Sequence, residues 1–279
     1  MNTITANIQP LTRENFDFMR ELLYQETAIA LADGKEYLVE TRLTSIATRH
    51  GYGSVNELVA HFRTRPAVTP GTPLFEAYDA LTTNETLFFR DINPFNSLRD
   101  HIIPEIAAQN PGRPISIWSA ACSTGQEAYS VAMLFAEHFP DIAFRILGTD
   151  ISNAVLKKAE AGTYHQHEVN RGLPAKLLIK HFRQQAGLWQ LNADIRSRVK
   201  FSHLNLARKW ATLPRFDIIL MRNVLIYFDT ATRRAILEQV RSHLLPKGYV
   251  SLGGSESTMN IDDKLKPTVV DKSTFYRVV

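Results

Sequence analysis

Six small residues, Ser119–Thr124, separate a strand-like run from a helical pattern near the middle of the sequence. The residues before them, Ile115–Trp118, have the composition of a strand, and apolar side chains recur at helical spacing from Ala128 onward. In an open parallel sheet, ligands bind beyond the carboxyl ends of the strands. The first turn and the N–H groups of its helix form an anion-tolerant rim there. The pattern therefore predicts a nucleotide-type ligand at this turn.

An acidic residue, Asp150, ends the next predicted strand, which begins at Ala143. It lies 25 residues after Gly125, near the spacing at which a dinucleotide-binding unit places a carboxylate on ribose hydroxyls. A carboxylate suits this task because it accepts hydrogen bonds from two adjacent hydroxyls. The alternative interpretation is a helix N-cap at Asp150 or Ser152.

Two further segments combine polar, aromatic and basic side chains. In residues 81–91, LTTNETLFFRD, hydroxyl and amide groups adjoin two phenylalanines and an arginine. Thr82 precedes Glu85 by three residues, so a capping box at a helix start is also compatible with this segment. Residues 222–229, RNVLIYFD, follow an apolar run, Phe216–Met221, that is typical of a buried strand.

The composition of the turn discriminates between ligands. A pyrophosphate site requires G-x-G-x-x-G, whereas this turn contains Gly125 alone. The sequence also lacks the motifs G-x-x-x-x-G-K-[ST], H-E-x-x-H and G-x-S-x-G. The residues that an ATPase, a metalloprotease or a hydrolase of these types would need are therefore missing. S-adenosylmethionine, which carries no phosphate, therefore fits better than NAD(P) or FAD.

The residues after Gly125 alternate between helix and strand, as in a parallel α/β domain. Two short runs with alternating character, at 187–191 and 198–202, predict antiparallel strands in a small appendage. The C-terminal residues 274–279 are expected to close the sheet edge. Other predicted helices lie at 127–138, 152–161, 174–182 and 230–245, and other strands at 143–150, 216–221 and 250–254.

The N-terminal part, from Thr12 to about Phe62, has a helical period and predicts a small bundle. Residues 65–73 contain three prolines and a glycine, so they are interpreted as a linker, and a domain boundary is placed near residue 80. Within the bundle, three basic residues are spaced seven apart, which puts them on one stripe: Lys35, Arg42 and Arg49. This stripe could dock an acidic partner. Alternatively, the stems flank an apolar face and extend to water.

Composition limits the class of protein. A chain of 279 residues with 44% hydrophobic residues can fill a globular core. No apolar run approaches the roughly 18 to 20 residues that cross a bilayer, and the N-terminus lacks signal-peptide features, so a cytoplasmic protein without membrane insertion is expected. One cysteine, Cys122, excludes an internal disulfide and a cysteine-based zinc site, and no metal is predicted. The net charge of +4 is compatible with an acidic partner.

The chemistry-bearing segments together resemble the CheR-type chemotaxis receptor methyltransferases. Motif order, spacing and the N-terminal helical domain agree over nearly the whole chain, and T-N-x-T-x-F-F-R is far more specific than a glycine pattern. The resemblance implies a Rossmann-like class I methyltransferase sheet (81–279), a small all-helical N-terminal domain (1–80) and a small β-subdomain near 182–202. It is carried by LTTNETLFFR (81–90), SAACSTGQEAYS (119–130), TDIS (149–152), NL (205–206) and RNVLIYF (222–228).

The resemblance also implies the reaction. A methyl group passes from S-adenosylmethionine to glutamate carboxylates on the cytoplasmic helices of chemoreceptors, giving glutamate methyl esters and S-adenosylhomocysteine. Tyr227 occupies a position where a hydroxyl could face the transferring methyl group. The implied cofactor contacts are Asn84, Thr86 and Arg90 at the amino-acid end, Glu127 at the ammonium, Asp150 at the ribose, Asn205 and Leu206 at the adenine, and Arg222 and Asn223 for the remaining contacts.

This chemistry needs no general base, because a glutamate with an ordinary pKa of about 4.3 is already ionised near neutral pH. Catalysis can then come from alignment, exclusion of water and prearranged charge. Arg90 is the best candidate to orient the acceptor carboxylate. The alternative for Arg90 is an ion pair with Asp91 or Glu85.

The resemblance strengthens the hypothesis that the basic stripe docks a receptor helix. It also equates the appendage with the β-subdomain by which some members bind a receptor C-terminal pentapeptide. Here the loop at 183–188 is shorter than in those members, so tethering is not expected, and the protein is expected to be monomeric.

Two other functions are alternatives to receptor methylation. One is an S-adenosylmethionine enzyme for nucleic acid or a small molecule, which the sequence pI of about 9.1 suggests. Nucleic-acid methylation would favour an aromatic-lined pocket for a flipped base and a stronger basic cleft. The sequence has no Asn-Pro-Pro-Tyr-like segment at the end of the fourth strand, so nucleic acid is not expected as a partner. The other is a non-catalytic adaptor, against which Arg90 and Tyr227 argue.

Overall fold

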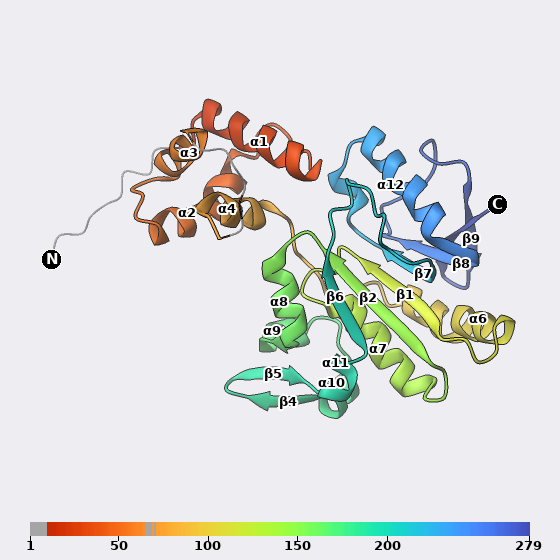
Figure 1. Ribbon diagram of the computed structural model, residues 1–279. Coiled ribbons are helices and arrows are strands. Elements are labelled where there is room, and N and C mark those ends of the chain that lie inside the picture. The colour runs from red at the N-terminus through yellow and green to blue at the C-terminus, as the bar shows by residue number, and fades with distance from the viewer. Residues whose placement is uncertain (1–9, 65–68, 70) are drawn as a thin grey trace. The chain divides into compact units, whose positions relative to one another are not determined.

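The computed structural model of the protein describes residues 10–64, 69 and 71–279 (Figure 1). Contacts divide the chain into two compact units, with the division between Thr83 and Asn84. Most of the predicted linker, residues 65–68 and 70, lies outside the described residues.

The first unit is built from helices, as its helical period predicts. The apolar residues Phe16, Met19 and Leu23 are buried, as are Val39 and Leu43 on the next helix. The helices are α1 (Arg13–Thr27), α2 (Glu36–Arg49), α3 (Val55–Thr64) and α4 (Pro73–Leu81).

Helix α4 lies between the predicted linker, residues 65–73, and the predicted domain boundary near residue 80, where no helix is predicted from the sequence. Thr72 caps it by accepting a hydrogen bond from the Phe75 N–H, and Pro73 is tolerated in the first turn because its missing N–H would have no partner there. Thr82 follows the last residue of α4, and residues 83–92 form no helix. The capping box considered for Thr82 and Glu85 is therefore wrong.

Two residues of the predicted basic stripe contact α4. The Arg42 guanidinium donates to the carbonyls of Leu81 (2.8 Å) and Thr82 (2.9 Å) at the C-terminal end of α4. Arg49 pairs with Glu76 at 2.6 Å. The Lys35 ammonium lies 5.7 Å from the centre of the Tyr37 ring. Arg42 and Arg49 thus bind groups of the first unit itself, whereas the alternative to docking had their ends extend to water.

The second unit contains a seven-stranded sheet in the order β6-β2-β1-β7-β8-β10-β9. All pairs are parallel except those of β10, which runs antiparallel to β8 and β9. The predicted edge position of the C-terminal strand is wrong, because β9 pairs with its outer side. The strands are β1 (Ile115–Ala120), β2 (Phe144–Asp150), β6 (Val199–His203), β7 (Phe216–Met221), β8 (Leu244–Leu252), β9 (Leu265–Val270) and β10 (Ser273–Val278).

The predicted helices of this unit are confirmed. α7 contacts β1, β2 and β6, and its N-terminus follows the small-residue turn. No helix among residues 10–64 and 71–279 is long and apolar enough to cross a membrane. The helical segments are α5 (Asn93–Ser97), the π-helix η1 (Leu98–Ile102), α6 (Ile103–Gln109), α7 (Gln126–His138), α8 (Asn153–Ala161), α9 (Gln166–Val169), α10 (Ala175–His181), α11 (Ala193–Arg196), the 3-10 helix η2 (Leu225–Tyr227) and α12 (Thr230–His243).

The core is formed around the central strands, whose residues are buried almost throughout. Trp118 on β1 is fully buried, stacks on Phe216 and meets Trp210 edge to face at 5.0 Å. Its indole N–H donates to Thr149 Oγ1 at 2.9 Å, so the polar atom of this large side chain is satisfied.

A small antiparallel sheet, in the order β3-β5-β4, forms the appendage (Figure 1). Its strands are β3 (Thr163–Tyr164), β4 (Phe182–Gln185) and β5 (Leu188–Leu191). Ala186 and Gly187 connect β4 to β5, both with positive φ, as in a two-residue type I′ hairpin. The predicted strand at 198–202 is not part of this appendage. As β6 it pairs in parallel with β2, because its buried face completes the large sheet.

The contacts of Arg42 predict a stability effect that Arg49 should not share. Arg42→Ala is expected to lower the free energy of unfolding of the first unit by about 1–2 kcal/mol, because hydrogen bonds from a charged donor to terminal carbonyls are lost. Arg49→Ala removes an exposed ion pair and should cost about 0–1 kcal/mol. Hydrogen exchange of the α4 amides, measured in the full chain, should accelerate only in Arg42→Ala. Equal exchange in both variants would contradict the capping role.

Candidate functional site

The small-residue turn joins β1 to α7 and has an unusual backbone. Ala121, Ser123 and Gly125 all have positive φ, of 53°, 51° and 91°. A Cβ at Gly125 would lie 3.1 Å from Ala159 Cβ and 3.1 Å from the Tyr129 ring. Glycine is therefore required there both for its backbone conformation and for the close packing of the turn.

Asp150 holds this turn at the end of β2. One carboxylate oxygen accepts the Ser123 N–H and the other the Ser152 N–H, both at 2.9 Å. Ser152 is the N-cap of α8, because its hydroxyl accepts the Val155 N–H. Of the two N-cap candidates, Asp150 and Ser152, Ser152 is therefore the cap. Asp150 is a buried carboxylate that faces the turn. Its predicted ribose contact stays a prediction.

The appendage supports the same turn from another side. The Tyr164 hydroxyl on β3 donates to the Thr124 carbonyl at 2.8 Å, and burial raises the pKa of this phenol well above its ordinary value. Phe88 packs edge to face on both Tyr164 (5.0 Å) and Phe182 (5.7 Å). An aromatic cluster thus connects β3 and β4 with the segment before β1.

The segment Asn84–Asp91 is irregular and is bound to the turn and to α7. The Ser123 hydroxyl donates to the Asn84 carbonyl at 2.6 Å, and the Phe89 N–H donates to Ser130 Oγ at 2.9 Å. Gly172 makes room for it, because a Cβ there would lie 2.0 Å from the Phe88 carbonyl oxygen. With Phe88 and Phe89 buried, the half-buried side chains of Asn84, Thr86 and Arg90 come from a fixed backbone.

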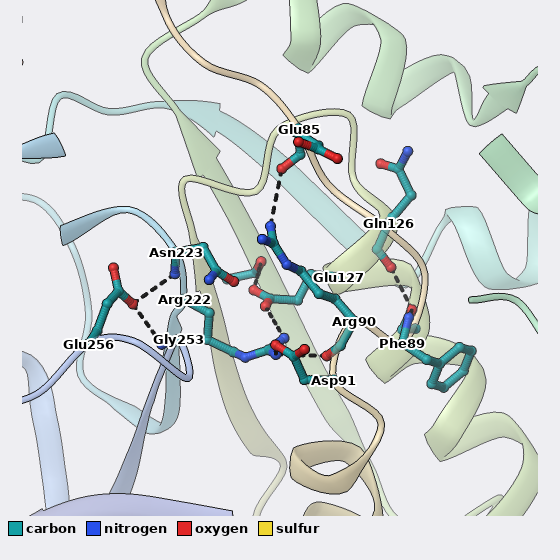
Figure 2. A network of polar contacts seen from close by, with 12 residues as sticks. Glu85, Phe89, Arg90, Asp91, Gln126, Glu127, Arg222, Asn223, Gly253 and Glu256 are labelled. Carbon is teal, nitrogen blue, oxygen red and sulfur yellow. Dashed lines mark hydrogen bonds and ion pairs between the residues drawn. The ribbon is translucent and has the colours of Figure 1, made fainter. Parts of the chain in front are cut away.

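Arg222, at the end of β7, lies at the centre of the polar network in Figure 2. Its guanidinium donates to Glu127 (3.1 Å), to the Arg90 carbonyl (2.7 Å) and to Asp91 (2.9 Å), and the side chain is 2% exposed. The other oxygen of Glu127 accepts the Ser119 hydroxyl at 2.7 Å. Arg222 therefore joins β7, α7 and the irregular segment. We call Arg222 and these partners the hub.

The Arg90 side chain projects away from this hub toward the Glu85 backbone (Figure 2). Its guanidinium reaches the Glu85 carbonyl at 3.4 Å and forms no salt bridge with any described residue. Asp91 pairs with Arg222, and Glu85 pairs with Arg171, whose hydrogen bond lowers the pKa of the Glu85 carboxyl. Neither carboxylate therefore forms a salt bridge with Arg90, although the Arg90 charge also contributes to the lowered pKa of Glu85.

The loop after Arg222 carries Asn223 and Tyr227. Asn223 has a φ of 58°, and its N–H donates to a carboxylate oxygen of Glu256 at 2.8 Å. Its side-chain oxygen is buried and has no hydrogen-bond partner in the described chain. Tyr227 ends η2 and is half-buried.

Asn205 and Leu206 lie in the loop after β6, beside the end of β2. The Leu204 N–H donates to the Asp150 carbonyl at 2.9 Å, which fixes this loop next to the turn. Asn205 Oδ1 accepts the Ala207 N–H, and Leu206 is buried. Their predicted adenine contacts are therefore compatible with the position of Asp150.

The donor set fits the predicted cofactor. An ionised carboxylate offers about four acceptor sites, and Glu127 uses two of them within the protein. It can also accept from an ammonium group, while Asp150 lies one strand away for ribose hydroxyls. Burial raises the pKa of the Cys122 thiol well above its ordinary value, so this residue stays a small neutral group beneath the turn.

Several residues of the network are not among the predicted site residues. Ser123 and Ser130 bind the backbone of the irregular segment, and Asp91 binds Arg222. All three lie within or next to the quoted motifs, and this proximity is the signal by which the sequence could have identified them. Glu256 and Gly172 are distant in sequence from every motif, and only the folded chain reveals them.

Comparisons with known proteins agree with this geometry. Residues 84–274 match the family described as "CheR methyltransferase, SAM binding domain", and residues 14–70 match "CheR methyltransferase, all-alpha domain". The chain is 37% identical to Chemotaxis protein methyltransferase 1 of Pseudomonas aeruginosa, over 94% of this chain and 97% of the relative. It is 37% identical to the Chemotaxis protein methyltransferase of Vibrio parahaemolyticus, over the full length of both.

These matches confirm the predicted cofactor, S-adenosylmethionine, and the predicted fold class. That class combines a Rossmann-like methyltransferase sheet with an N-terminal helical domain and a small antiparallel sheet. The chain belongs to the CheR methyltransferase family.

Proposed function

We propose that this protein methylates glutamate side chains on the cytoplasmic helices of chemoreceptors, and that it acts in the cytoplasm. The main support is the T-N-x-T-x-F-F-R segment, which is bound to the cofactor turn and presents an Arg90 without a salt bridge. The curated relatives are chemotaxis protein methyltransferases, which favours a receptor substrate.

S-adenosylmethionine supplies a methyl group already activated on a sulfonium, so the protein's main task is positioning. In this proposal Glu127 accepts the cofactor ammonium and Asp150 its ribose hydroxyls. Arg222 contributes by fixing the Glu127 carboxylate, since it donates to one oxygen while Ser119 donates to the other.

Arg90 orients the acceptor carboxylate in this proposal. The acceptor is ionised near neutral pH, so no proton has to be removed before transfer. The hydrogen bonds from Arg90 must keep the carboxylate aligned without binding it so tightly that the ground state is favoured over the transition state. Tyr227, on the loop after β7, lies on a neighbouring element and is proposed to face the transferring methyl group.

The direct test is methyl transfer to a panel of receptor cytoplasmic fragments. The protein is incubated with radiolabelled S-adenosylmethionine and each fragment, and the product is treated with base. We expect labelled methanol, because glutamate methyl esters are base-labile. Label on RNA with none on any fragment would contradict the proposed substrate.

Arg90→Ala separates binding from transfer. This variant should still bind S-adenosylhomocysteine, since Glu127 and Asp150 are intact, but its kcat should fall about 100-fold because carboxylate alignment is lost. Arg171→Ala is the matched control, as it removes a nearby exposed arginine that pairs with Glu85. A wild-type kcat in Arg90→Ala would remove the proposed role.

The first unit is proposed to dock the receptor helix through its basic stripe. Lys35 and Arg49 are exposed, whereas Arg42 is half-buried and committed to the end of α4. The docking contribution should therefore come mainly from Lys35 and Arg49.

We also propose that this protein acts without a C-terminal receptor tether. The connection between β4 and β5 is only the two-residue turn Ala186–Gly187, which offers little surface beyond the strands. Isothermal titration with a receptor C-terminal pentapeptide should show no micromolar binding, with a scrambled peptide as control. Specific micromolar binding would contradict this expectation.

A further inference from the structure

The carboxylate of Glu256 binds three backbone N–H groups at the end of the sheet. It accepts from Gly253 at 2.6 Å, from Asn223 at 2.8 Å and from Ile226 at 3.3 Å. The chain after β8 turns back to make this possible, since the Glu256 N–H donates to the Gly253 carbonyl at 2.9 Å. Figure 2 shows Glu256 directed at the Asn223 backbone. We call these contacts the Glu256 clasp.

The clasp lies where the parallel ladder between β7 and β8 stops. The last paired residues are Met221 and Leu252, so the N–H groups just beyond them have no strand partner. One carboxylate replaces the missing ladder and joins the ends of both strands. Hydrogen bonds to an ionised acceptor are roughly twice as strong as neutral ones.

The backbone around the clasp is specialised for it. Asn223 has a positive φ of 58°, a conformation that Asn tolerates better than most residues. A Cβ at Gly253 would lie 2.7 Å from the Asn223 nitrogen and 2.7 Å from a Glu256 oxygen. Only glycine at this position lets the two strand ends approach closely enough to share one carboxylate.

The clasp lies at the edge of a pocket. Glu256 and Gly253 line a pocket of about 420 Å³ beside Arg222, and Glu256 is half-buried. Glu256 forms no salt bridge with any residue of the described chain, and its carboxylate accepts hydrogen bonds from the three backbone N–H groups. Farther along, the loop is anchored by the buried side chains of Leu225 and Phe228 and by Arg233, which donates to the Phe228 carbonyl at 2.8 Å. The clasp therefore holds the part of the loop nearest β7, at Asn223 and Ile226.

We propose that Glu256 is a positioning residue for methyl transfer, which rests on the proposed function. By holding the backbone at Asn223 and Ile226, the clasp fixes both Asn223 and the adjacent Tyr227. Arg222 is fixed independently by Glu127 and Asp91, so the loop is held at its start by the hub and at Asn223 and Ile226 by Glu256.

The test replaces Glu256 with Gln, which keeps the size but removes the charge and turns one acceptor into a donor. The kcat for receptor fragments should fall about 30- to 100-fold, because misplacement of about 1 Å can cost 100-fold, while KM for the fragment stays within about twofold. Glu256→Asp keeps the charge and should recover part of kcat. In a Tyr227→Phe background, Glu256→Gln should cost far less, because both changes act on one group.

Asp262→Asn is the matched control for a merely structural effect. Asp262 is a carboxylate in the same β8–β9 connection that accepts the Lys264 N–H at 2.9 Å and pairs with Arg241 at 2.7 Å. This variant should lose thermal stability and keep kcat. The proposal is wrong if Glu256→Gln keeps kcat, if its effect adds fully to that of Tyr227→Phe, or if Asp262→Asn lowers kcat equally at the same loss of stability.

A second measurement separates this inference from the proposed function. If the wild-type protein methylates no receptor fragment, the proposed function fails, and S-adenosylhomocysteine titration then tests the clasp alone. Glu256→Gln should weaken binding about 5-fold through Asn223 and add nothing in an Asn223→Ala background. Unchanged binding in Glu256→Gln would overturn the positioning role.

Discussion

The candidate site depends on one buried cation. Arg222 is 2% exposed at its side chain, and such a charge persists in the interior only when acceptors surround it. Those acceptors come from two separate parts of the chain: Glu127 on α7, and the Arg90 carbonyl and Asp91 carboxylate of the irregular segment. Pairing the two terminal guanidinium nitrogens therefore requires β7, α7 and the irregular segment to meet in one arrangement, while the buried Nε has no hydrogen-bond partner among the described residues. The same requirement fixes the Glu127 carboxylate and sets the direction in which Arg90 leaves the backbone.

The small-residue turn between β1 and α7 is held by a different kind of constraint. Its positive-φ residues place N–H and carbonyl groups in positions that helices and strands do not use, so neighbours must satisfy them. Asp150 takes the Ser123 N–H and Tyr164 donates to the Thr124 carbonyl. Because Tyr164 also packs on Phe88, the appendage and the motif segment are part of the same support. The small sheet thus belongs to the architecture of the site as well as to the surface.

Much of the fold and the location of the site could be predicted from sequence, because both depend on local patterns. The buried runs of β1, β2 and β7, the turn before α7 and the acid at the end of β2 all have periodic or positional signals. Strand pairing has no such signal: residues 198–202 alternate like an antiparallel strand, yet β6 completes the large sheet. Contacts between distant residues, such as Arg42 with the end of α4 and Glu256 with Asn223, depend on the folded chain and could not be read from spacing.

The three tryptophans are distributed in a way that suits spectroscopy. Trp118 and Trp210 are buried and in edge-to-face contact, whereas Trp189 lies half-buried on β5 of the appendage. The first 83 residues contain none. Intrinsic indole emission therefore reports only on the second unit, with the core pair and the appendage contributing distinct environments. Melting of the helical unit is silent in that signal and has to be followed by circular dichroism.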